Sequence, residues 1–337
     1  MSTQATNKTY ERTVFAHKDQ NNNYKLESGI YISDPNTGDK YGDFKFYQGR
    51  GAIKYQRSDV AKLEFDRASL NTLKDTYHKT SSPTSFLSGL LALHPEKDFD
   101  QYQKNPSLFS YLPPLNQHSN AFLIFPNLPY IETPSLLDTP TTMKDSREGI
   151  AICAYAVHPN QDLSLIQHIE NKSQPNNTNT SYSNDIRTAN EIESGTTVKY
   201  LTSILDLDAG DIPLLEGLRE HMLEHLTQVY NINIIEDKVQ LFFHFPVAEV
   251  TATLHLHARV NKADHPLNEA RSFPLSEVIE TLKNGSSIID MILTRNNGIY
   301  YTEAETGVSQ IQNIPNKGIV KNPFILDLSQ PFEKHNT

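Results

Sequence analysis

Cysteine and tryptophan are nearly missing from this chain, which has one cysteine and no tryptophan among its 337 residues. Cys153 cannot form a disulfide within the chain, and the apolar run Ile150–Val157 around it favours a small core residue over a nucleophile. No apolar run approaches membrane-spanning length, so the sequence predicts no membrane partner. The polar stretch Met1–Tyr10 indicates no secretory signal peptide. We expect a cytoplasmic protein, and delivery into a host cell by a signal-independent route stays open.

An excess of basic residues is missing as well, since the formal net charge is −10 at pH 7. Broad, nonspecific binding of nucleic acids needs a basic surface, so this charge disfavours that class of function. A small nucleotide held by a few local cations remains compatible with it. The length suits one large domain or two modest ones.

The order of the expected elements favours an α+β fold, in which helices flank an antiparallel sheet. Strands are expected at Gly29–Ile32, Tyr41–Gln48, Ala121–Phe125, Ile150–Val157, Val239–Phe245 and Val250–Val260. Helices are expected at Ser58–Phe65, Ala68–His78, Ser85–His94, Ile212–Tyr230 and Leu275–Leu282, with Asp211 as the N-cap of the longest one. The turn residues Asn296-Asn297-Gly298 between Ile292–Thr294 and Ile299–Thr302 predict a β-hairpin.

We expect three parts along the chain. Residues 1–118 form a smaller α+β N-terminal domain, residues 119–310 form the larger, catalytic domain, and residues 311–337 form a C-terminal tail. Within the larger domain, residues 160–195 are poor in hydrophobic side chains, which predicts a mobile insertion.

The stretch Val250–Val260 carries the strongest signal for chemistry, because polar and apolar residues alternate along it. A β-strand sends successive side chains to opposite faces, so every second residue shares a face. The polar set is Thr251, Thr253, His255, His257 and Arg259. Imidazoles beside a permanent cation can hold a phosphate group and attack it.

The residues His255-Leu256-His257-Ala258-Arg259 resemble the signature of the histidine triad (HIT) superfamily, in which three histidines alternate with apolar residues. The helix Asp211–Leu226, the strand Val239–Phe245 and the stretch Glu269–Leu282 are similar, in the same order, to the C-terminal domain of the scavenger mRNA-decapping enzymes. The resemblance is specific over residues 211–282 and loose over 121–302. It implies a HIT-like fold for the larger domain and a homodimer.

The resemblance also implies roles for individual residues. In this family the middle histidine attacks a phosphorus atom and forms a covalent intermediate that water then cleaves. The nucleophile would be His257, and His255 would orient it. His244 and Arg271 stand where the family binds ligand phosphates, and Thr253 joins them as a substrate-binding residue.

The chain departs from the family pattern at two points. Arg259 stands at the third histidine, and an arginine cannot give up its proton at working pH, although it can stabilise charge on a phosphate. A uridylyltransferase branch that carries glutamine at this position is active. Members that bind the mRNA cap use a tryptophan, which this chain lacks. A capped RNA fragment is therefore a less favoured substrate than a generic small nucleotide.

A second register fits the alternation as well. In it the motif is Thr253-Leu254-His255-Leu256-His257, with His255 as the nucleophile and His257 as the acid. We favour the first register, because the apolar Val260 then follows directly behind the motif.

Histidines also allow simpler interpretations. A metal at the His-x-His pair would need further ligands, of which His244 and Glu249 are the nearest in sequence, and the charge of Arg259 opposes a divalent cation. We expect no metal and no other cofactor. His221 and His225 lie one helical turn apart, and we expect them on a solvated face.

The sequence thus predicts a HIT-like nucleotide hydrolase or nucleotidyl transferase that acts on a pyrophosphate-containing nucleotide. Arg259 and Arg271 would stabilise the developing negative charge. The missing third histidine motivates a second hypothesis, a catalytically impaired domain that binds a nucleotide or a protein partner.

Overall fold

The computed structural model describes residues 59–80, 108–116, 119–127, 150–158, 199–249, 252–261, 266–304, 314 and 316–324. Of residues 1–58 it also describes the backbone of β1 (Tyr10–Arg12), β2 (Ala16–Lys18), β3 (Tyr24–Leu26), β4 (Gly29–Ser33) and β5 (Lys40–Lys45). These strands form the sheet β1-β4-β5 and the pair β2-β3. The strands expected near residues 29–32 and 41–48 are therefore confirmed. The helix expected at Ser85–His94 and the insertion at residues 160–195 lie outside the described residues.

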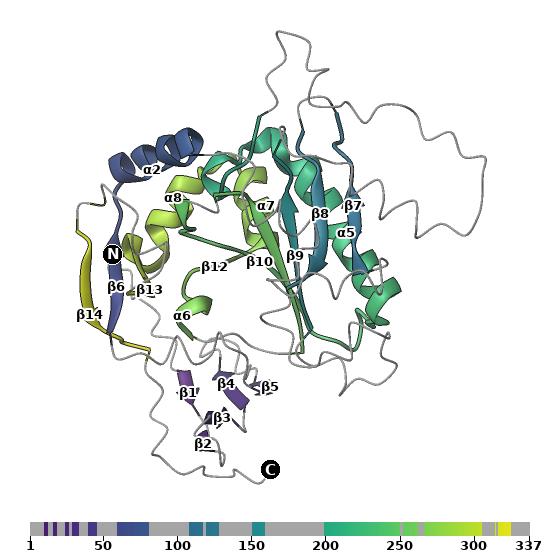
Figure 1. Cartoon of the computed structure of the whole chain (residues 1–337), viewed down its shortest axis with the longest axis horizontal. Helices are drawn as coiled ribbons and strands as arrows, with labels where there is room; N and C mark the ends of the chain where they lie inside the picture. The colour runs from purple at the N-terminus through teal and green to yellow at the C-terminus, as the bar shows by residue number, and fades with distance from the viewer. Residues whose placement is uncertain are drawn as a thin grey trace, which may run out of the picture.

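A six-stranded antiparallel sheet forms the centre of the fold, in the order β12-β10-β11-β9-β8-β7 (Figure 1). Its strands are β7 (Ser110–Leu112), β8 (Phe122–Pro126), β9 (Ala151–Ala156), β10 (Val239–His244), β11 (His255–Val260) and β12 (Ser272–Pro274). With the helices described below, the sheet confirms the expected α+β class. β11 is shorter than the predicted strand, because residues 252–254 are not in extended ladder geometry.

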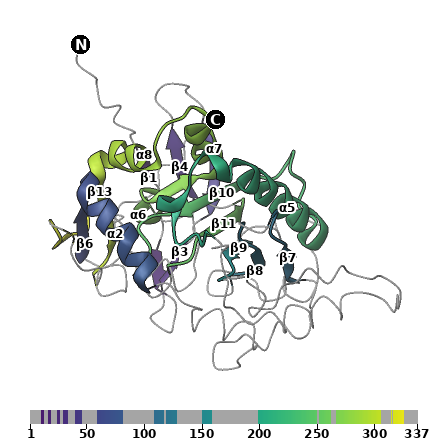
Figure 2. The ribbon, with the colours of Figure 1, turned by 90° about the horizontal axis from the view of Figure 1, so that it is seen from above.

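Two helices cover one face of this sheet, α5 (Ile212–Tyr230) and α7 (Leu275–Lys283) (Figure 2). Helix α5 begins and ends at the predicted residues, because Leu215, Leu218, Met222 and Leu226 recur at helical spacing and are all fully buried. Asp211 takes the N-cap position without capping: its carboxylate instead accepts from Lys199 Nζ at 2.6 Å. The pairing of an apolar helix stripe with alternate sheet residues produces the main core.

A second sheet has the strand order β13-β6-β14, and helix α2 (Arg67–Thr80) follows β6 along the chain and contacts the helix at Ile288–Thr294. Its strands are β6 (Asp59–Glu64), β13 (Ile299–Glu303) and β14 (Gly318–Lys321). The helix predicted for Ser58–Phe65 is wrong. Ala61 and Leu63 alternate with Lys62 and Glu64 in burial, and strands from the far end of the chain pair with β6 on both sides. Such distant pairing overrides the local pattern.

The predicted hairpin around Asn296 is also wrong. Residues Ile288–Thr294 form helix α8, and the turn η10 (Arg295–Gly298) joins that helix to β13. Asn296 and Asn297 do adopt the left-handed conformation, with φ of 52° and 53°. Gly298 has φ of +72°, and a Cβ there would lie 2.6 Å from the carbonyl oxygen of Phe65. The turn residues were thus predicted correctly, but the elements that the turn connects were not.

The remaining short helices are η7 (Ile204–Asp206), η8 (Ala209–Asp211) and α6 (Pro266–Glu269).

The larger of two hydrophobic clusters among the described residues crosses the predicted domain boundary. Phe65 and Tyr77 of the first predicted domain pack in the same cluster as Phe245 and Tyr300 of the second, and the ring centroids of Phe65 and Phe245 are 5.6 Å apart. The Tyr77 hydroxyl donates to the carbonyl oxygen of Val247 at 2.7 Å and accepts from its amide at 3.2 Å. Strand β14, beyond residue 310, pairs with β6. Among the described residues, packing therefore crosses both predicted boundaries, at 118 and at 310.

None of the helices in the described ranges combines the length and the apolar character that crossing a bilayer requires.

Candidate functional site

The face of the six-stranded sheet opposite α5 and α7 carries the polar residues of β11. In the register of the sheet, His257 pairs with Cys153 of β9 on one side and with Phe242 of β10 on the other. Cross-strand partners share a face. We call this the histidine face, made of His255, His257, Arg259, Cys153, Tyr155, Phe242 and His244. The expected sharing of one strand face by His255, His257 and Arg259 is confirmed.

Thr253 precedes the strand and does not belong to this row. Its hydroxyl is hydrogen-bonded to the hydroxyl of Tyr200, and its side chain is buried. Thr253 contacts the site through its backbone, because its carbonyl oxygen lies 2.7 Å from Nδ1 of His255. The predicted polar row is thus corrected at Thr253, and Thr251 lies outside the described residues.

The imidazole rings form a tight cluster. The ring centroids of His244 and His257 are 4.4 Å apart, and those of His255 and His257 are 4.9 Å apart. Tyr155 stacks on His255 at 4.7 Å with an interplanar angle of 8°, and Phe242 stacks on His257 at 5.3 Å and 12°. One parallel aromatic neighbour for each ring restricts the rotation of His255 and of His257. The structure therefore brings together three of the histidines singled out in the sequence.

Burial keeps these imidazoles neutral. It lowers the pKa of His255 to about 4, and it lowers the pKa of His244 and of His257 well below 6.5. The charges of Arg259 and Arg271 act in the same direction on His244 and His257. A neutral imidazole holds one nitrogen lone pair, which can accept a proton or attack an electrophile. The site is thus an arrangement of neutral bases beside cations.

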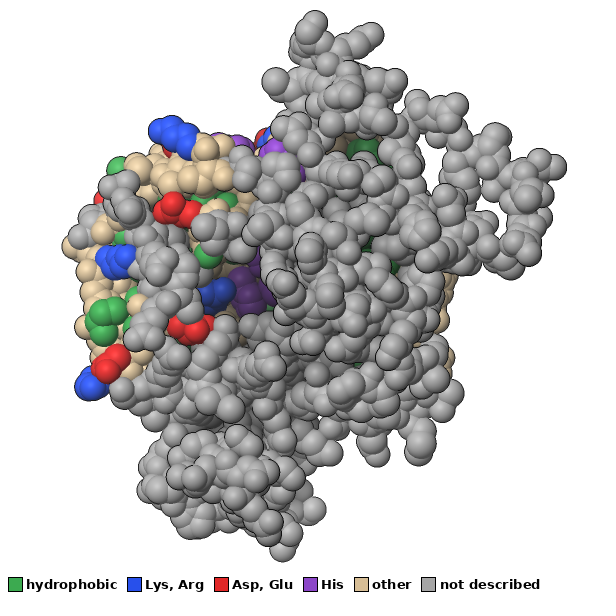
Figure 3. Space-filling model, viewed as in Figure 1, with side chains coloured by type: hydrophobic (Ala, Val, Ile, Leu, Met, Phe, Trp, Pro, Cys, Tyr) green, Lys and Arg blue, Asp and Glu red, His purple; other side chains and the backbone are tan. Residues whose placement is uncertain are grey.

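Both predicted arginines contribute to this surface. The Arg259 guanidinium carbon lies 5.7 Å from the centre of the Phe242 ring. Arg271 comes from the turn between α6 and β12, and its charge reaches all three imidazoles, as their lowered pKa values indicate. Figure 3 shows histidine side chains beside a lysine or arginine side chain on the face in view.

Several buried polar atoms of this region have no hydrogen-bond partner among the described residues. They are Nε2 of His257, Nε of Arg271 and Oε1 of Gln240, which pairs with Arg259 across the sheet. Leaving such atoms unsatisfied costs about 1–3 kcal/mol each. A bound anion would satisfy Arg271 Nε, and a phosphate oxygen or phosphorus atom would contact His257 Nε2.

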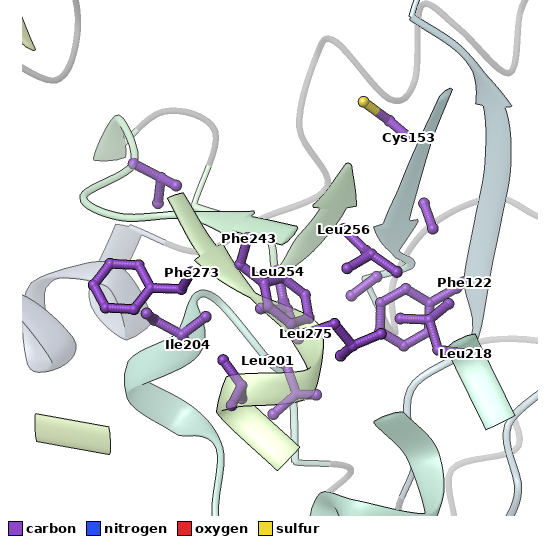
Figure 4. Close-up of a cluster of buried hydrophobic side chains, with 14 of the residues drawn as sticks. Phe122, Cys153, Leu201, Ile204, Leu218, Phe243, Leu254, Leu256, Phe273 and Leu275 are labelled. Atoms are coloured by element: carbon purple, nitrogen blue, oxygen red, sulfur yellow. The ribbon is translucent and has the colours of Figure 1, made fainter. Parts of the chain in front are cut away.

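Cys153 is buried as predicted, and burial raises the pKa of its thiol to about 12. Its surroundings are not those of a simple core residue, however. Sγ lies 3.4 Å from Nδ1 of His257 and accepts from Nδ2 of Asn127 at 3.2 Å. In Figure 4 the sulfur points away from the cluster that contains Phe122 and Leu256. Sequence reasoning missed this contact, because Cys153 and His257 are 104 residues apart and only the sheet register unites them.

The other histidines of the sequence analysis lie elsewhere. His225 is buried in α5, where burial lowers its pKa to about 4, so the expected solvated face is wrong for this residue. His221 is hydrogen-bonded to Ser110 Oγ at 2.7 Å. Within the described ranges, no group of three or more His, Cys, Asp and Glu side chains has the arrangement of a metal site.

The chain was compared with protein-family models and with curated protein sequences. Neither a protein-family model nor a curated protein sequence matches it.

Proposed function

We propose that the histidine face binds a pyrophosphate-containing nucleotide and cleaves its phosphoanhydride bond through a phosphohistidine intermediate. The chain would act as a hydrolase or a nucleotidyl transferase, and the sheet with α5 and α7 would be a HIT-like domain. The observation that carries this proposal is the placement of three neutral imidazoles and the Arg259 side chain on one sheet face, with the charge of Arg271 acting on all three imidazoles.

The chemistry of phosphoryl transfer fits these residues. A neutral imidazole nitrogen can attack phosphorus, and the two steps of a covalent route each have a lower barrier than one direct displacement. Phosphoryl transfer depends mainly on positioning and on stabilising negative charge at the phosphate oxygens. Arg271, with a buried and unsatisfied Nε among the described residues, and Arg259 would supply that stabilisation.

The same residues favour one class of leaving group. Arg259 cannot donate a proton, and the imidazoles have pKa values below the working range, so the site has no strong general acid. An alcohol would need a proton to leave, whereas a nucleoside phosphate leaves as a stable anion. We therefore expect dinucleoside polyphosphates or similar anhydrides as substrates, ahead of phosphate esters.

The test is a turnover assay with dinucleoside polyphosphates and a cap dinucleotide, quenched at alkaline pH and analysed by mass spectrometry for a nucleotide bound to the chain. We expect nucleoside monophosphate as a product and a covalent adduct on a histidine. The control is His221→Gln, on α5 and away from the histidine face, which should retain turnover. Unchanged turnover in a folded His255→Asn, His257→Asn double variant would refute the mechanism.

A second candidate function, binding without turnover, is favoured by Arg259 in place of the third histidine. Calorimetry with the same nucleotides separates the two. Binding that Arg271→Gln weakens, with no product formed over hours, would identify a nucleotide-binding domain without catalytic activity.

A further inference from the structure

The two histidines of β11 have different partners at Nδ1. For His255 the partner is the carbonyl oxygen of Thr253, at 2.7 Å. A carbonyl oxygen can only accept a hydrogen bond, so Nδ1 of His255 carries the hydrogen. In the neutral ring, the lone pair of His255 therefore resides on Nε2, the nitrogen farther from the backbone.

For His257 the partner at Nδ1 is the thiol of Cys153, at 3.4 Å. Burial keeps this thiol protonated, so Sγ has one hydrogen to donate. Asn127 Nδ2 donates to Sγ, and His257 Nδ1 lies within reach of the thiol hydrogen, so the ring can accept that hydrogen at Nδ1. A neutral ring that accepts at Nδ1 carries its hydrogen on Nε2.

We propose that Cys153 is a positioning residue that holds His257 in the Nε2–H tautomer, so that His255 is the nucleophile and His257 donates a hydrogen bond to the phosphate. This assignment rests on the proposed function, and it adopts the second of the two sequence registers for the nucleophile. It also gives the buried Nε2 of His257, which has no partner among the described residues, a phosphate oxygen to bind.

The reaction balances without a proton from the protein. The lone pair of His255 Nε2 forms a bond to phosphorus, and the bridging P–O bond breaks with its electron pair on the departing nucleoside phosphate. Water then attacks the same phosphorus, the N–P bond breaks, and its electron pair returns to Nε2. The proton released by the water passes to the phosphate product or to solvent. His257 keeps its proton throughout and serves as a hydrogen-bond donor.

Nuclear magnetic resonance of the full chain with ¹⁵N-labelled histidine tests the tautomers in the absence of any nucleotide. Long-range ¹H–¹⁵N correlations distinguish a protonated from an unprotonated Nε2. We expect an unprotonated Nε2 in His255 and a protonated Nε2 in His257. The reverse pattern, or a protonated Nε2 in both, would overturn the proposal.

Cys153 variants test the positioning role. Cys153→Ala removes the donor, so His257 should shift toward the Nδ1–H tautomer, and kcat should fall about 100-fold with little change in KM, because the phosphate loses one hydrogen-bond donor. Cys153→Ser keeps a donor of similar size and should restore both the tautomer and most of the turnover. An unaltered His257 tautomer in a folded Cys153→Ala variant would contradict the assignment.

Mapping the covalent adduct by peptide mass spectrometry separates this inference from the proposed function. An adduct on His255 supports both. An adduct on His257 supports the proposed function and overturns the assignment made here. The predicted tautomers without any adduct or product would instead refute the proposed turnover, while the role of Cys153 in setting the tautomer of His257 would stand.

Discussion

Neighbouring residues of β11 belong to two very different surroundings. Leu256, Ala258 and Val260 pack against the side of the sheet that α5 and α7 cover, and each is almost completely buried. His255 and His257 project to the other side, among aromatic rings and guanidinium groups. The first face stabilises the fold, and the second holds polar atoms that the described residues leave unsatisfied. Alternate residues of β11 thus belong to the hydrophobic core and to the histidine face.

The largest effect is expected from His255→Asn, on the histidine face. Asparagine is polar and of similar size, but it has no lone pair able to attack phosphorus, so turnover should fall on the order of 10⁴-fold or more. The free energy of unfolding should change little. Steady-state kinetics and urea denaturation measure the two quantities. A large loss of stability would mean that the two faces are not separate in function.

Leu256, which follows His255 in the strand and lies on its other face, provides the matched comparison. Leu256→Ala removes a fully buried side chain from the helix-covered face and should lower the free energy of unfolding by about 2–5 kcal/mol. The folded fraction should keep its kcat, because the histidine face is unaltered. If Leu256→Ala instead abolishes turnover in protein that remains folded, the core and the site are coupled.

Arg271→Gln should weaken the stabilisation of phosphate charge and lower kcat/KM about 100-fold, the scale seen when one donor to a developing anion is removed. Glutamine retains a hydrogen-bond donor but loses the charge and the paired geometry. The pKa of His244, His255 and His257 should rise slightly, because a nearby cation is gone. Titration by nuclear magnetic resonance detects that rise, and its absence would place Arg271 outside the site.

The smallest effect is the dependence on pH. The groups that interact with His255 are Tyr155 of β9, His244 of β10, His257 of its own strand, the carbonyl of Thr253, and Arg271. Burial lowers the pKa of His255 to about 4, so turnover should stay level from pH 8 to about pH 5 and fall only as the pH approaches 4. A fall centred near pH 6.5 would indicate an exposed, ordinary imidazole.

The free energy of unfolding should depend on pH through the same lowered histidine pKa values. The unfolded chain binds a proton at each histidine near pH 6.5, more readily than the folded chain does. The free energy of unfolding therefore has its full value above pH 6.5, where these rings are neutral in both states. It decreases as the pH falls from 6.5 toward 4, because the unfolded chain then binds protons that the folded chain does not. Replacing His225, which is also buried and has a pKa of about 4, tests how much of that loss belongs to the histidine face.

Local patterns predicted the elements whose apolar periodicity is clear within the segment itself, such as α5 and β9. Helix α5 was predicted with its bounds, since its apolar stripe and its flanking residues lie within one segment. Strand β6 was not, because its partners β13 and β14 lie more than 200 residues away. The alternation in β11 placed His255 and His257 on one face, but no spacing could report that Cys153 would meet His257. Nor could it report that Thr253 would leave the strand and offer its carbonyl to His255.

The two hydrogen bonds between Tyr77 and Val247 have a practical consequence for anyone who expresses this protein in pieces. They clamp the segment that leaves β10, next to His244, onto a helix encoded some 170 residues earlier. A fragment that starts at residue 119 would contain every side chain of the histidine face and still lack this clamp. Cloning for functional work should therefore retain residues 59–80.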